Sequence, residues 1–141
     1  MKKQLIERFS HTDEGYMPSL ITGPWQAAFL NYAPAEALEA ITKLDIHHLT
    51  DEAFILLKGH VVLIAASQSG QGVDFEVTDM VPEIIYNIPR ETWHKVAMEP
   101  GSSLLIVENA LTHQADFEFL DLSDEEKRTL CQVVNEAKKD R

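Results

Sequence analysis

The sequence of 141 residues predicts an all-β domain, built as a β-sandwich or a small barrel. From residue 45 onward, short runs rich in Val, Ile, Leu and Phe recur at close intervals, and turn residues such as Gly and Pro separate them. A parallel sheet would need helical crossovers, and the spacers are too short to hold them. The strands therefore favour antiparallel pairing. The expected strands are residues 52–57, 61–67, 73–78, 83–88, 94–98 and 104–108.

The flanking segments predict a more mixed structure. The first twenty or so residues are punctuated by Gly and Pro, which indicates an irregular arm. Residues 25–32 are aromatic and apolar and favour a strand, whereas the strong helix formers of residues 35–43 favour a short helix. Near the other end, Ser123 and Glu126 have the spacing of a capping box. We therefore expect a C-terminal helix at about 123–139.

The chain length predicts one domain over residues 1–141. Residues at about 45–109 would form the barrel core, between an N-terminal arm over 1–44 and the C-terminal helix. With 45% hydrophobic residues, the chain can fill the core of one domain of this size. No repeat and no Pro-, Gly- or Ser-rich linker divides it further.

Charge and cysteine content exclude several classes of protein. Twelve Lys and Arg stand against 23 Asp and Glu, so the net charge is −11 and the chain would repel a nucleic-acid backbone. Cys131 is the single cysteine and cannot form an internal disulfide. The basic start of the chain is not followed by an apolar run of signal-peptide length, and no run is long enough to span a bilayer. We expect an acidic cytoplasmic protein without nucleic-acid or membrane partners.

Two stretches of the chain combine chemically active residues at defined spacings. In the first, the adjacent His47 and His48 precede Glu52, and six residues separate Glu52 from Gly59. In the second, four residues separate Pro89 from His94.

Together these stretches resemble the two sequence motifs of the cupin family. The first family motif is His-x-His, three or four residues, Glu, six residues and Gly; the second is Pro, four residues and His. The resemblance covers roughly residues 45–109, somewhat under half of the chain. It implies a small single-domain, RmlC-like cupin with a jelly-roll barrel, which agrees with the fold class predicted from strand spacing. In the second motif, Glu91 and Met98 replace the usual Gly and Asn.

The resemblance also implies a metal site. Its ligands would be His47, Glu52 and His94, and its metal a divalent transition ion such as Mn, Fe, Ni or Zn. Two imidazoles and one carboxylate on one side of such an ion leave open positions for substrate, water or oxygen.

The adjacent histidines leave one ligand ambiguous. If His47 fills the second histidine slot of the motif, the first slot holds Asp45; if His48 fills it, the first slot holds Ile46. Residues two apart on a strand share a face, so the first register gives two polar inward residues. We therefore prefer His47, keep His48 as the alternative, and treat Asp45 as an optional fourth ligand.

The remaining polar candidates are less specific. His11 lies in the expected arm, His60 follows a turn glycine and His113 lies in a connecting segment, so none of them is predicted to be a ligand. Tyr86, Glu108 and His113 could carry protons near the cavity, and the sequence does not select among them.

The implied function is a metal-dependent cupin that acts on a polar small molecule, of sugar or hydroxy-acid type, by isomerase, lyase or oxygenase chemistry. The alternative is a non-catalytic binding or sensing module, metal-free or with a structural metal. We also expect a homodimer, in which a partner covers either residues 25–32 or the C-terminal helix, because long apolar strand edges tend to be covered. The alternative is that the arm or the helix covers that edge within one chain.

Overall fold

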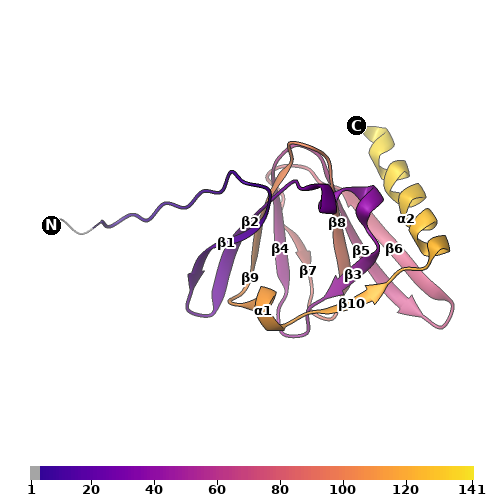
Figure 1. The fold of residues 1–141 in the computed structure, drawn as a ribbon, viewed down its shortest axis with the longest axis horizontal. Helices are drawn as coiled ribbons and strands as arrows, with labels where there is room; N and C mark the ends of the chain where they lie inside the picture. The colour runs from indigo at the N-terminus through magenta and orange to yellow at the C-terminus, as the bar shows by residue number, and fades with distance from the viewer. Residues whose placement is uncertain (1–3) are drawn as a thin grey trace.

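The computed structural model describes residues 4–141 and contains ten strands (Figure 1). Its helical elements are the 3-10 turns η1 (Pro34–Glu36), η2 (Leu38–Ala40) and η3 (Lys138–Asp140) and the helices α1 (Thr112–Ala115) and α2 (Asp124–Ala137). The strands are β1 (Gly15–Thr22), β2 (Trp25–Asn31), β3 (Lys43–Ile46), β4 (Glu52–Lys58), β5 (Val61–Ser69), β6 (Gly72–Asp79), β7 (Tyr86–Ile88), β8 (Trp93–Met98), β9 (Ser103–Asn109) and β10 (Glu118–Asp121).

The strands form two antiparallel sheets of five. The first has the order β1-β2-β9-β4-β7 and the second the order β10-β3-β8-β5-β6. Alternate residues of each strand point between the sheets, which is why short apolar runs could form a closed core. The core between the sheets includes Phe54, Leu56, Leu104 and Ile106 from the first sheet and Val61, Leu63, Val96 and Met98 from the second. This arrangement confirms the predicted all-β fold class.

Helix α2 covers the outer face of the second sheet, beside β6 (Figure 1). Its buried Leu130 and Val134 join a second apolar cluster with residues of β5. The helix begins with the expected capping box: the Ser123 hydroxyl accepts from the Glu126 backbone N–H at 3.1 Å, and the Glu126 carboxylate accepts from the Ser123 N–H at 2.8 Å. The predicted C-terminal helix is confirmed.

The expectation of an irregular arm is wrong from Gly15 onward. Residues Gly15–Thr22 form β1, which pairs with β2 through a hairpin at Gly23. The register shifts between Met17 and Leu20, so Pro18 lies at a bulge, where a missing N–H does no harm. Pairing with an apolar neighbour outweighs the local turn signals. With β1, β2 and β10, the sheets extend beyond residues 45–109 on both sides.

The helix expected over residues 35–43 is also wrong. The segment forms the two short turns η1 and η2, and its last residue starts β3. Ala37 is extended, with ψ of 149°, and separates the turns. So short a segment cannot offset the cost of starting an α-helix, and the turns instead bury Leu38 and Ile41 against the second sheet.

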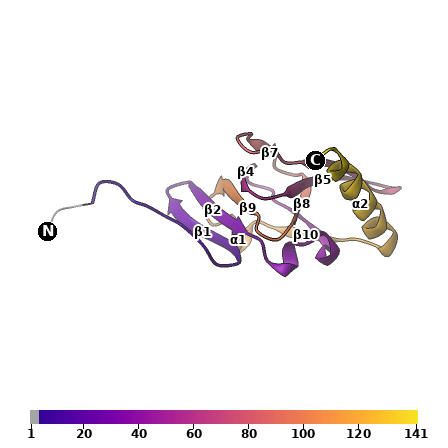
Figure 2. The same ribbon diagram turned by 90° about the horizontal axis from the view of Figure 1, so that it is seen from above.

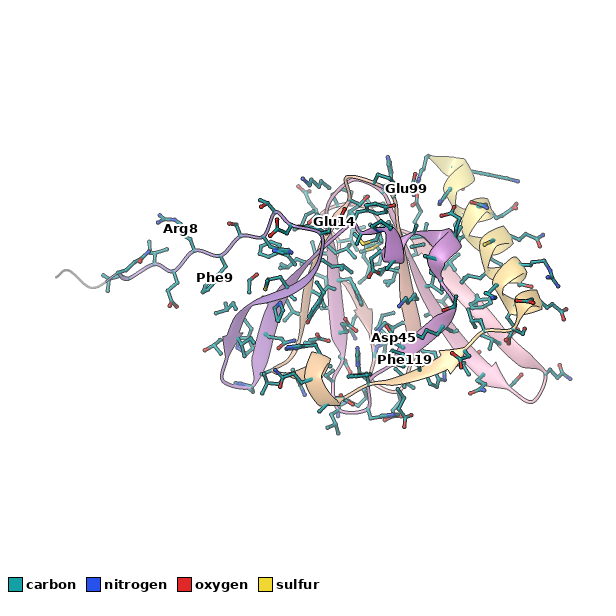
Figure 3. All side chains as sticks on the ribbon, viewed as in Figure 1. Arg8, Phe9, Glu14, Asp45, Glu99 and Phe119 are labelled. Atoms are coloured by element: carbon teal, nitrogen blue, oxygen red, sulfur yellow. The ribbon has the colours of Figure 1, made fainter. Side chains whose placement is uncertain are left out.

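The strand predicted at residues 25–32 is confirmed as β2, but it is not an edge strand. It lies between β1 and β9, so the chain covers it without a partner. That finding removes one reason for expecting a homodimer, which stays a prediction. Residues 4–9 extend away from the sheets in both views (Figures 1 and 2), and Arg8 and Phe9 lie on this extension (Figure 3). The residues that follow return to the first sheet, where the backbone oxygens of His11 and Asp13 each accept from Asn31 Nδ2 of β2 at 2.9 Å. Within residues 4–141, no helix is long and apolar enough to cross a membrane.

Candidate metal centre

Three side chains from both sheets meet at one end of the space between the sheets. His47 directly follows β3, Glu52 is the first residue of β4, and His94 lies near the start of β8. Because β3 and β8 pair at Asp45 and His94, the two histidines approach from the second sheet while Glu52 approaches from the first. One ligand atom from each of the three residues lies within 4.8 Å of the other two.

The two imidazole rings are held in a defined orientation. His47 Nδ1 lies 2.6 Å from the backbone oxygen of Asp116, and His94 Nδ1 lies 3.0 Å from that of Thr92. A carbonyl can only accept, so both Nδ1 atoms carry the proton, and in a neutral ring Nε2 presents its lone pair. Such carbonyl contacts are typical of metal-binding histidines.

The Nε2 atoms both point at the same oxygen of Glu52. His47 Nε2 lies 3.0 Å and His94 Nε2 2.8 Å from Glu52 Oε2. This oxygen is buried, and within the described residues neither contact has the geometry of a hydrogen bond. Donor atoms bound to one ion at about 2.1 Å lie roughly 3–3.5 Å apart, so these spacings resemble those around a single ion. The donor set therefore fits a divalent transition metal.

The protonation of the site opposes metal binding at low pH. Burial alone would lower the pKa of His47, but the Glu52 carboxylate, the Asp116 carbonyl and Glu108 outweigh it and raise the pKa to about 9. Burial would raise the pKa of Glu52, but His47 and His94 lower it to about 2. Without metal, the His47 imidazole is therefore protonated and faces an ionised Glu52 carboxylate near neutral pH.

This pairing predicts a pH-dependent stability for the metal-free protein. The pKa of His47 is raised on folding, so its contribution is complete below about pH 6.5 and disappears as the pH rises through about 9. We expect the free energy of unfolding to fall by about 1–3 kcal/mol across that window, measured by urea unfolding with a chelator present. His47→Gln should remove most of this dependence of the unfolding free energy on pH. An equally steep curve in His47→Gln would contradict the assignment.

The alternative ligand His48 lies outside the centre. Its Nδ1 contacts Glu91 at 2.9 Å and its Nε2 contacts Glu118 at 3.0 Å, on a side chain that is 38% exposed. Asp45 lines the cavity beside the centre but does not belong to the converging set, and its carboxylate lies 3.5 Å from the Lys95 ammonium. Figure 3 places Asp45 next to Phe119 of β10, with which it pairs.

A polar network beside the centre was not selected from the sequence. The Tyr16 hydroxyl donates to Glu108 Oε1 at 2.7 Å, and the Gln26 amide donates to the same oxygen at 3.2 Å. Burial, followed by the charge of Glu52, raises the pKa of Glu108, and burial raises that of Tyr16. Glu108 was among the proposed proton carriers, whereas Tyr16 lies in the segment expected to be irregular. The sequence did contain one signal for this network: Glu108 is a charged residue at an inward position of the apolar strand β9.

The three converging side chains open onto a cavity of about 220 Å³. At about 30 Å³ per water molecule, this volume corresponds to about seven waters and suits a small ligand. His113 of α1 also lines the cavity, whereas His11 and His60 do not. The apolar part of the lining consists of Leu30, Phe54, Val96 and Ile106.

Comparison with known proteins identifies the fold that contains this site. No protein-family model and no curated protein matches the chain. A cupin superfamily protein from Desulfitobacterium hafniense has a similar structure, with a TM-score of 0.52 and 17% identity over 72% of this chain and 84% of that one. The capsular polysaccharide assembling protein CapF from Staphylococcus aureus is also similar, with a TM-score of 0.52 and 15% identity over 82% of this chain. The matched region is 34% of CapF, so this chain corresponds to about a third of that protein.

These likenesses show the fold. The chain has the cupin fold, as its two motifs implied. Its His47–Glu52–His94 cluster forms a possible metal site within that fold.

Proposed function

We propose that this protein is a metal-dependent cupin that acts on a small polar molecule, with one divalent transition ion held by His47, Glu52 and His94. The observation that carries the proposal is the approach of both Nε2 atoms to Glu52 Oε2, at 3.0 and 2.8 Å, without hydrogen-bond geometry within residues 4–141. Three buried or half-buried lone-pair donors facing one point are poorly stabilised unless a cation or a proton lies among them.

The residues around the cluster have separate roles in this proposal. The carbonyls of Asp116 and Thr92 orient the rings, and the apolar walls formed by Phe54 and Ile106 limit access of water. A bound divalent ion supplies Lewis-acid chemistry to a carbonyl or hydroxyl group placed in the cavity.

Metal analysis of the purified full chain tests the proposal. We expect close to one equivalent of metal, or, after chelation, stabilisation by about 2.7 kcal/mol when added Mn, Fe, Co, Ni or Zn reaches about a hundredfold its dissociation constant. His94→Ala should lose both signals. His60→Ala, which changes an exposed histidine outside the cavity, is the matched control. Absence of metal together with absence of stabilisation by all five ions would contradict the proposal.

A further inference from the structure

One oxygen of Glu108 is buried beside the metal centre without a hydrogen-bond partner in the described chain. The Glu108 side chain is 3% exposed and lines the cavity, and its Oε2 lies 3.9 Å from His47 Nε2. Buried polar atoms are almost always hydrogen-bonded, so an orphaned carboxylate oxygen that faces a cavity indicates a missing donor.

The Glu108 carboxylate cannot turn to satisfy this oxygen elsewhere. Its other oxygen is held by Tyr16 and by Gln26, a fully buried side chain. Gln26 is itself fixed, because its Oε1 accepts from the Leu111 N–H at 2.8 Å and its Nε2 lies 3.1 Å from His113 Nδ1. Contacts from three separate segments of the chain therefore hold Glu108 in this orientation.

Glu108 lies next to the converging donors without being one of them. Its oxygens do not join the set of atoms that lie within 4.8 Å of one another, at least among residues 4–141. It would therefore contact a ligand bound beside an ion held by His47, Glu52 and His94. A second residue of the lining shows the same feature: Asp45 Oδ1 is also buried without a hydrogen-bond partner in the described residues. Besides Glu52, two carboxylates of the lining therefore each have an oxygen without a hydrogen-bond partner in the described residues.

The charge of the lining disfavours an anionic ligand. Four carboxylates line the cavity, whereas the one Lys or Arg in the lining, Lys95, is already paired with Asp45. The charges of Glu52 and Glu108 together balance a divalent ion held by neutral imidazoles. A carboxylate or phosphate in the cavity would add an anion that no remaining Lys or Arg side chain of the lining neutralises.

We propose that the free oxygen of Glu108 accepts a hydrogen bond from a hydroxyl of the ligand, and that the ligand is an uncharged polyhydroxyl compound of sugar or polyol type rather than a carboxylate or phosphate ester. This inference rests on the proposed metal-dependent function of the same cavity. In this proposal Glu108 contacts the ligand and makes the cavity favour an uncharged ligand over an anionic one.

A matched set of three probes tests this inference on the manganese-loaded full chain. D-glucose, D-glucuronate and D-glucose 6-phosphate form the same six-membered ring and differ only at carbon 6, where the first is uncharged and the other two are anionic. Their binding is followed through the water-proton relaxation of Mn²⁺. We expect D-glucose to bind about tenfold more tightly than either anion, because an unpaired anion buried in this lining is costly.

Two variants separate the hydrogen bond from the charge. Glu108→Gln should weaken D-glucose binding about fivefold, the loss of one good hydrogen bond, and should strengthen D-glucuronate binding. Glu36→Gln removes another carboxylate of the lining, so it should strengthen D-glucuronate binding but leave D-glucose binding within about twofold.

The outcomes distinguish this inference from the function on which it rests. Failure to bind Mn²⁺ would overturn both. Binding of Mn²⁺ with no binding of D-glucose, with tighter binding of either anion, or with equal effects of the two variants on D-glucose would overturn this inference and leave the metal site standing.

Discussion

Replacing His47 with alanine should weaken metal binding at least about a hundredfold, whereas the same change at His48 should alter it by less than about twofold. His47 supplies an Nε2 atom 3.0 Å from Glu52 Oε2, on a side chain that is 13% exposed. His48, one position further along the chain, points to the surface and contacts Glu91 and Glu118. Removing a group that only orients a metal ligand typically lowers metal affinity 10- to 100-fold. Removing one of the three ligands themselves should lower the affinity further.

The measurement is calorimetric titration of Mn²⁺ or Zn²⁺ into each metal-free variant, with circular dichroism to show that both are folded. His48→Ala is a matched control, because it removes the same side chain from the adjacent position. Equal losses in the two variants, or a larger loss in His48→Ala, would mean that the centre is built on the other register of the motif.

Replacing Gly59 with alanine should destabilise the protein by about 3–5 kcal/mol, through a backbone clash. Gly59 ends the first motif, directly after β4, and has a φ of +83°. A Cβ atom there would lie 2.6 Å from the Cα of Ser102, closer than real Cβ contacts come. Ser102 cannot easily move, because its hydroxyl accepts from the His60 N–H and donates to the His60 carbonyl, both at 2.8 Å.

Gly101→Ala provides the control for conformational strain. Gly101 has nearly the same φ, +82°, but a Cβ atom there would meet no heavy atom within 4 Å. Its replacement should cost only the strain of the left-handed region, about 1–2 kcal/mol. Urea unfolding of both variants measures the difference. Similar losses in the two variants would show that Ser102 yields and that the close approach at Gly59 contributes little.

The success of the strand predictions has a local cause. Residues 52–57, 61–67, 73–78, 94–98 and 104–108 all lie within observed strands, since inward and outward residues alternate with a period of two. The prediction at residues 83–88 was too long, because β7 is only Tyr86–Ile88. The C-terminal helix was predicted for a similar reason, because a capping box is formed by residues three positions apart.

The failures have non-local causes. Strand β1 depends on pairing with β2, and β10 depends on pairing with β3, about seventy residues away. The turns at residues 34–40 form because Leu38 and Ile41 are buried against the second sheet, whose strands lie elsewhere in the chain. Local propensity carries no information about such partners. Gly and Pro in the first segment therefore predicted an irregular arm, and Ala in the second predicted a helix.

The candidate site divides in the same way. Spacing within each motif was sufficient to name His47, Glu52 and His94, because a strand start and a turn fix side-chain direction over a few residues. The approach of Tyr16 and Gln26 to Glu108 joins the first strands of the chain to the ninth, and no short-range pattern encodes it. The sequence by itself thus determined the strands, the capped helix and the candidate ligands, which follow from residues close together in the chain. Only the tertiary structure decided which histidine faces Glu52 and which carboxylate oxygen is left for a ligand, because both depend on how distant strands pack.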